Sequence, residues 1–153
     1  MLTQSLVFDK GLVSEFRFNE PVVNRNLSTS PVVIASTVLA PGASTERVWL
    51  NASVDWTFSF TGTGPANVLF EITRNGAVIH SAVQSISGSS IIFGFVVYNH
   101  LALQHLDVRP ASGTGPVLYK LQARVMSAPP GTATVTSAVL SAAKLILTPS
   151  RRM

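Results

Sequence analysis

The sequence contains few side chains that could carry out chemistry. Three histidines, His80, His100 and His105, could join Asp107 as metal ligands. Because side chains alternate between the two faces of a strand, His105 and Asp107 would share one face. A metal site needs three or four converging ligands, and the spacing places only these two together. We therefore interpret the histidines and Asp107 as structural residues and predict no metal site.

The spacing patterns of common catalytic sites are also missing. No two acidic residues have a helical or strand spacing suited to paired-carboxylate catalysis. The sequence has no G-x-S-x-G element for a serine nucleophile, no P-loop and no cysteine. The similar segments TGTGPANVLF and SGTGPVLYKL lead from glycine-rich turns into strands, and we interpret them as matched turns at one end of a sandwich. We predict neither an enzyme nor a bound cofactor.

Charge and hydropathy limit the possible partners. Only 12% of the residues are charged, which predicts a surface suited to burial against copies of the same chain. The net charge is +4, but the cations are spread singly, apart from Arg151 and Arg152, so no nucleic-acid binding is predicted. The start of the sequence lacks a signal-peptide pattern, and the longest apolar run, 91–98, is too short for a membrane helix. We expect an intracellularly made protein without membrane insertion.

The segment 47–60, RVWLNASVDWTFSF, is the strongest structural signal. Apolar residues occupy all its even positions, and polar residues occupy all its odd positions except Trp49, which predicts a long strand with one buried face. A strand of this length is expected to bend or bulge, near Ala52 and Ser53. Trp56 is predicted to lie in the core. Trp49 lies on the opposite face and is a candidate interface residue, since aromatic side chains are enriched at interfaces.

A β-hairpin is predicted around Asn75-Gly76, between 67–74 and 77–86. This dipeptide tolerates the positive φ angles of a type I′ turn, and the two-residue loop fixes the register of both strands. The expected partners are Arg74 with Ala77, Thr73 with Val78, Ile72 with Ile79, and Glu71 with His80.

The remaining strands define the fold class. Strands are expected over 31–39, 91–98, 101–109, 117–127 and 132–147. The run 91–98 is apolar on both faces, as in a strand covered on both sides or by a neighbouring subunit. The last segment could form a short helix, but we prefer a strand with its odd residues, Val135 to Leu147, on one face. The prediction is an all-β, eight-stranded, jelly-roll-type antiparallel β-sandwich.

Residues 1–30 differ in pattern from the rest and are predicted to be an N-terminal arm or connector. The sandwich is expected over 31–148, followed by a basic tail over 149–153. The weakly alternating segments TQSLVF and VSEFRF are expected to dock on a neighbouring subunit, although a frayed terminus is the simpler alternative. The arm residues predicted at this subunit interface are Leu6, Phe8, Val13, Phe16, Phe18, Val22 and Val23.

The block RVWLNASVDWTFSFTGTGPANVLFEITRNGAVIHSAVQSI resembles bacterial spore-surface proteins of the exosporium protein C type. Their similar block joins a long strand, a Gly-Pro turn and a hairpin, which here is VLFEITRNGAVI. The resemblance continues more loosely through YNHLALQHLDVR and VLYKLQARV, and so covers about residues 30–147. The architecture is also similar to that of endospore appendage subunits, which typically lock their joints with cysteines that this chain lacks.

This resemblance implies a non-enzymatic, self-assembling subunit of a spore surface layer or pilus-like fibre. The implied location is the exosporium or coat, after synthesis in the mother cell, with copies of itself and other spore-surface proteins as partners. Two alternatives stay open: a jelly-roll capsid or phage fibre protein, and a carbohydrate-binding module. The last would need exposed aromatic residues and acids lining a groove, which Trp49 alone does not supply.

Overall fold

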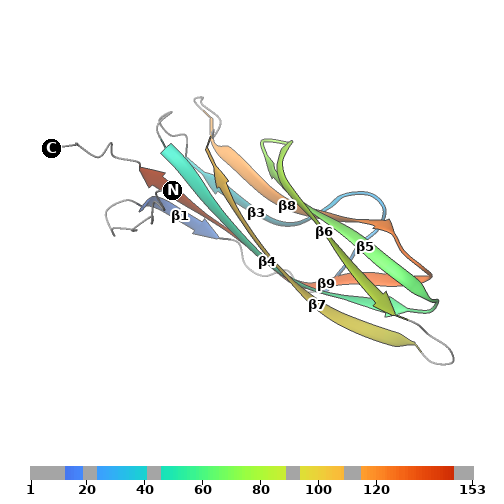
Figure 1. Ribbon diagram of the computed structural model, residues 1–153. Coiled ribbons are helices and arrows are strands. Elements are labelled where there is room, and N and C mark those ends of the chain that lie inside the picture. The colour runs from blue at the N-terminus through green and yellow to red at the C-terminus, as the bar shows by residue number, and fades with distance from the viewer. Residues whose placement is uncertain (1–12, 19–23, 41–45, 89–93, 109–114, 147–153) are drawn as a thin grey trace, which may run out of the picture.

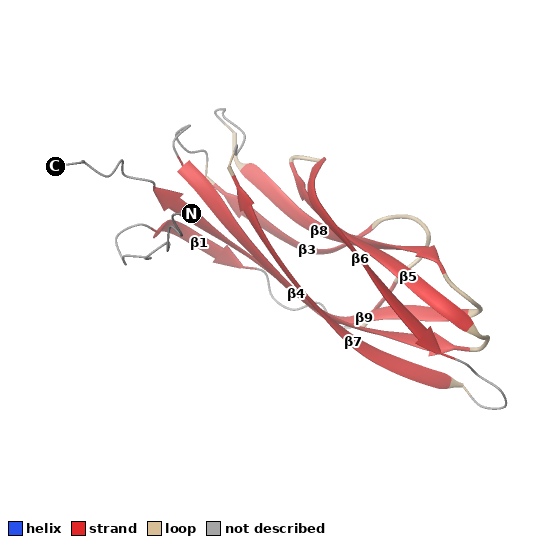
Figure 2. Ribbon diagram, viewed as in Figure 1, coloured by secondary structure: helices blue, strands red, loops and turns tan. Residues whose placement is uncertain are grey.

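The computed structural model describes residues 13–18, 24–40, 46–88, 94–108 and 115–146. These residues form strands in two facing antiparallel sheets (Figure 1), and they contain no helix and hence none that could span a membrane (Figure 2). The strands are β1 (Val13–Phe18), β2 (Arg25–Asn26), β3 (Val32–Leu39), β4 (Glu46–Phe60), β5 (Gly64–Arg74), β6 (Ala77–Gly88), β7 (Phe95–Asp107), β8 (Val117–Ser127) and β9 (Gly131–Ile146).

The strand order is that of a jelly roll. The first sheet has the order β1-β9-β4-β7, with the short β2 also paired to β9, and the second sheet has the order β3-β8-β5-β6. Successive strands from β3 to β9 mostly alternate between the two sheets, and the eight long strands form two facing four-stranded layers. The predicted all-β, jelly-roll-type sandwich is confirmed.

The eight long strands are not the eight that were expected. The segments 91–98 and 101–109, predicted as two strands, contribute to the single strand β7. The eighth strand is β1, which lies within the predicted arm and pairs with β9 of its own chain, from Val13 opposite Leu145 to Phe18 opposite Ser141. The structure thus uses this strand to complete its own first sheet. Docking of the arm on a neighbouring subunit stays a prediction.

The inward face of β4 forms the centre of the core. Its alternate side chains from Val48 to Phe60 are all buried, and they face buried residues of β5 and β8. Trp56 is 1% exposed, lies 6.0 Å from Phe70 between ring centroids, and donates a hydrogen bond from Nε1 to Gln84 Oε1 at 2.6 Å. Its predicted core position is confirmed, whereas Trp49 is half-buried on the outer face.

The bulge expected in the long strand lies in its partner instead. Asp55 pairs with Ser137 and Trp56 pairs with Val135, so Thr136 of β9 is an extra residue. An extra residue reverses the alternation beyond it. Val135 is buried, and the buried residues that follow are Ala138, Leu140, Ala142, Lys144 and Leu145. The predicted odd-numbered face of this strand is therefore wrong from Ser137 to Ala143, although Leu145 is buried.

A second bulge changes the register of the predicted hairpin. Arg74 pairs with Ala77 and Thr73 with Val78, as expected, and Asn75 and Gly76 have the positive φ angles of 47° and 89°. Beyond them Ile79 is an extra residue, so that Ile72 pairs with His80 and Glu71 with Ser81. The expected pairs of Ile72 with Ile79 and of Glu71 with His80 are wrong, because a two-residue turn fixes only the pairs before the first bulge.

The two Gly-Thr-Gly-Pro segments do not lie at one end of the sandwich. Gly64 starts β5, and Gly115 lies two residues before the start of β8. These strands are antiparallel, and their pairing runs from Asn67 opposite Ser127 to Arg74 opposite Tyr119. The starts of the two strands are consequently at opposite ends, and the prediction of matched turns at one end is wrong.

Replacing the central core tryptophan tests this packing. We expect Trp56→Ala to lower the free energy of unfolding by about 3–5 kcal/mol, because it removes a buried aromatic side chain. The matched control is Trp49→Ala, which removes a half-buried tryptophan from the opposite face of the same strand and should cost less. Chemical denaturation measures both values. Equal losses for the two variants, or a loss below about 1 kcal/mol for Trp56→Ala, would contradict the assignment.

Candidate functional site

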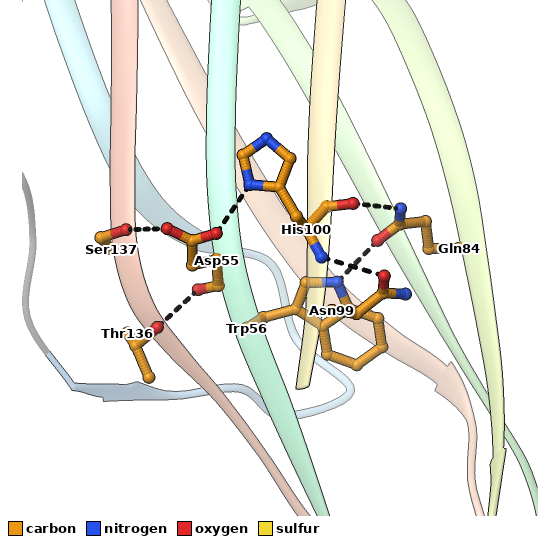
Figure 3. Close-up of polar contacts among 7 residues, drawn as sticks. All are labelled: Asp55, Trp56, Gln84, Asn99, His100, Thr136 and Ser137. Carbon is orange, nitrogen blue, oxygen red and sulfur yellow. Dashed lines mark hydrogen bonds and ion pairs between the residues drawn. The ribbon is translucent and has the colours of Figure 1, made fainter. Parts of the chain in front are cut away.

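The most distinctive polar cluster lies on the outer face of the first sheet. Asp55 of β4 and His100 of β7 are cross-strand partners, and both side chains point away from the core. His100 Nδ1 lies 2.6 Å from Asp55 Oδ1, and each side chain is about half exposed (Figure 3). Because an ionised carboxylate can only accept hydrogen bonds, Nδ1 is the donor. The result is a surface Asp–His pair fixed by strand register.

The bulge in β9 brings two hydroxyl groups to the same aspartate. Ser137 Oγ donates to Asp55 Oδ2 at 2.8 Å, and Thr136 Oγ1 donates to the backbone oxygen of Asp55 at 3.1 Å (Figure 3). The hydrogen bond from His100, followed by that from Ser137, holds the pKa of Asp55 below its ordinary value. Asp55 is therefore an ionised carboxylate of fixed orientation at neutral pH.

The cluster contains Ser, His and Asp but is not arranged as a hydrolase triad. In such a triad the histidine stands between the serine, whose proton it takes, and the aspartate. Here Ser137 and His100 bond to opposite oxygens of Asp55, and the second ring nitrogen of His100 points away from the other residues drawn in Figure 3. This geometry does not activate Ser137 by the triad mechanism, and the absence of enzymatic activity stays a prediction.

A shallow hollow opens beside this cluster. It has a volume of about 480 Å³, and it is lined by Asp55, Trp56, Tyr98, Asn99, His100 and Thr136. Tyr98 is 79% exposed. A second hollow of about 250 Å³ lies on the same strands, lined by Asn51, Ala52, Ser53, Ala102, Leu103, Gln104, Val139 and Ser141.

Sequence reasoning missed this site because its residues are far apart in the chain. The search for paired groups compared positions within one strand, whereas Asp55, His100 and Ser137 come from three strands. The alternation of β4 and β7 indicates that Asp55 and His100 both point outward. Only the register shows that they are opposite each other.

The residues considered as metal ligands are divided between two places. His80 and His105 stack with ring centroids 4.9 Å apart, between the two sheets, whereas His100 lies on the outer face. Asp107 accepts hydrogen bonds from Arg74 Nη1 at 2.6 Å and from Tyr119 Oη at 2.8 Å. Burial, followed by the hydrogen bond to Asp107, raises the pKa of Tyr119. Within the described ranges, no group of three or more metal-ligating side chains could hold an ion.

The predicted interface residues are only partly described. Leu6, Phe8, Val22 and Val23 lie outside the described residues. Val13, Phe16 and Phe18 belong to β1, whose backbone pairs with β9. Trp49 is half-buried opposite Leu106 and Ala143. An interface role for any of these residues stays a prediction.

Comparisons with known proteins concern the fold alone. Neither a protein-family model nor a curated protein sequence matches the chain. Dimeric latent PorU from Porphyromonas gingivalis is similar with a TM-score of 0.46 and 12% identity over 89% of this chain, which corresponds to 13% of the PorU chain. TmCBM61, solved in complex with β-1,4-galactotriose, has a TM-score of 0.30 and 12% identity, with 85% of this chain and 90% of that chain covered. A chain of infectious bursal disease virus, Gt strain, has a TM-score of 0.34 and 8% identity, with 95% of this chain and 41% of the viral chain covered.

The stacked histidines predict a stability that depends on pH. Burial, followed by the neighbouring His80, lowers the pKa of His105 from its usual 6.5, so folding favours the neutral ring. A depressed pKa contributes stability above the unfolded-state value, and this contribution is lost as the pH falls through the folded-state value. We expect the melting temperature to fall between pH of about 7.5 and about 5, and to fall less in His105→Gln. Thermal denaturation followed by circular dichroism measures this, and an undiminished fall in the variant would contradict the prediction.

Proposed function

We propose that this protein is a structural subunit that assembles with copies of itself. Following the resemblance of residues 30–147 to spore-surface proteins, we propose a surface layer or fibre of a bacterial spore as the assembly. The observation that carries the proposal is the side of the sandwich formed by β6 and β7, where two sheet edges lie together without an exposed charge.

Strands β6 and β7 are edge strands of their sheets, so the outer edge of each carries backbone N–H and C=O groups that no described strand of its own sheet pairs. In the described part of the chain, β6 pairs only with β5, and β7 pairs only with β4. The two edges lie side by side, joined by the hydrogen bond from Gln84 Nε2 to the backbone oxygen of His100 at 2.9 Å and by the stacked rings of His80 and His105. Free edges of this kind pair readily with another chain.

These edges lack the usual protection against pairing. Lysine, proline and other charged residues normally block exposed edge strands. Strands β6 and β7 contain no lysine, arginine or proline, and their single acid, Asp107, is buried against Arg74 and Tyr119. Five large hydrophobic side chains on these strands are exposed instead, namely Val78, Val83, Phe95, Val96 and Tyr98. Such a side is suited to contact with another subunit.

The opposite side of the sandwich is a suitable partner surface. It is formed by β1 and β3, and β3 exposes Val33 and Val38 in a strand without charged residues. Contact between unlike sides is heterologous, and it propagates as a fibre unless the rotation closes a ring. In this arrangement β1 stays paired with β9 of its own chain, and its other edge contacts the neighbouring subunit. Deleting residues 1–20 would remove β1 and expose the edge of β9. A truncated protein would therefore test the folding of the first sheet as well as the contact between subunits.

A charged residue on the free edge tests the proposal. We expect the full-length protein to form fibres or layers in negative-stain micrographs, and Val83→Lys to abolish them, because its ammonium group would have to be buried in the contact. Val83 is 52% exposed, so the variant should fold normally, which circular dichroism checks.

The matched control is Met126→Lys, at a 48% exposed residue of β8, a strand that is paired on both sides. This control should assemble as the wild type does. A monomeric wild type at every concentration, or assembly of Val83→Lys equal to that of the wild type, would refute the proposal. Closed shells would support the capsid alternative.

A further inference from the structure

The two hollows lie over neighbouring rows of the first sheet, and we call them together the outer-face groove. Strand register places Ser53, Ala102 and Val139 side by side in one row, and Asp55, His100 and Ser137 in the next row. The first row belongs to the smaller hollow, and Asp55 and His100 of the second row line the larger one. The small side chains of the first row keep the groove open beside the bulkier, polar second row.

The groove offers many hydrogen-bonding groups but no cation. Its lining includes the amides of Asn51 and Gln104 and the hydroxyl groups of Ser53, Thr136 and Ser141, whereas no lysine or arginine lines either hollow. Phosphate or carboxylate ligands are recognised by such cations. A ligand that suits this lining is neutral and carries many hydroxyl groups.

Tyr98 provides an aromatic surface at one end of the groove. It has the largest exposed fraction of the exposed large hydrophobic side chains in the described residues, and it lines the hollow together with Asp55 and His100. Binding sites combine apolar or aromatic surface with a few fixed polar groups. The C–H face of a sugar ring can stack on the phenol while its hydroxyl groups reach the neighbouring polar groups.

Asp55 is already held in the orientation that binding would need. Each carboxylate oxygen accepts one hydrogen bond, from His100 or from Ser137, and has a further lone pair for a ligand hydroxyl. Fixed polar groups reduce the ordering cost of binding.

We infer that the outer-face groove binds a neutral oligosaccharide, with Tyr98 stacking on a sugar ring and Asp55 accepting hydrogen bonds from its hydroxyl groups. A peptide strand cannot add to β4 here, because β4 is already paired with β7 on one side and with β9 on the other. The groove shares strand β7 with the side proposed for self-assembly, but it lies on the outer face of the first sheet, whereas the exposed Val78 and Val83 belong to β6 of the second sheet. It would give a structural subunit a second property, attachment to a glycan.

Affinity gel electrophoresis of the full-length protein tests this inference. The probes are soluble neutral glucan, galactan, mannan and xylan, with the acidic polygalacturonate for comparison. Val83→Lys serves as the common background, and all variants are compared at one protein concentration. Any assembly that remains is then the same in each variant, so that a failure of the assembly proposal does not change the comparison. We expect retardation by at least one neutral polysaccharide. Tyr98→Ala should weaken the affinity at least about tenfold, whereas Tyr98→Phe, which keeps the ring, should retain it.

Asp55→Asn provides a second, independent variant. It keeps the shape of the side chain but loses the charge and one acceptor, so we expect weaker retardation, while Met126→Ala on the other sheet should bind like the background protein. Circular dichroism confirms that each variant is folded. Retardation by no neutral polysaccharide, retardation by polygalacturonate alone, or equal retardation of Tyr98→Ala and the background protein would overturn the inference.

Discussion

Strand β4 is hydrogen-bonded along both of its edges, and the rest of the sandwich is arranged around this constraint. It pairs with β9 from Glu46 to Phe60 and with β7 from Val48 to Phe60. Buried backbone groups must all find partners, so β4 cannot shift without breaking two ladders. A shift by one residue would also turn Trp56 outward and Asp55 into the core. The core and the outer-face groove are consequently two faces of one fixed strand.

The bulges at Thr136 and Ile79 connect the packing of the core to the polar surface. Thr136 is the extra residue in β9, and it allows Val135 and Ala138 both to be buried while Ser137 points outward to Asp55. Ile79 is the extra residue in β6, and it packs against the core while His80 turns toward His105. Bulges commonly redirect side chains in this way next to functional sites. Here they set the geometry of the Asp55 cluster and of the contact between β6 and β7.

The alternation of apolar and polar residues was sufficient to predict the fold class, the extent of β4 and the burial of Trp56. The dipeptide Asn75-Gly76 was sufficient to predict the turn. These features depend on neighbours in the chain. The bulges, the strand order and the pairing of Asp55 with His100 depend on how distant strands match, which alternation does not encode. For the same reason Val13–Phe18, weakly patterned by itself, was not identified as an edge strand of the sandwich.

Hydrogen–deuterium exchange at low and high protein concentration tests the proposed assembly most directly, because it reports on the edge itself. If β6 and β7 form the subunit contact, the backbone amides of Ala77–Gly88 on the free edge become protected as the concentration rises. Amides of the doubly paired β4 should exchange equally slowly at both concentrations. Unchanged exchange across β6 and β7 in an assembled sample would show that the subunits associate elsewhere and would contradict the account.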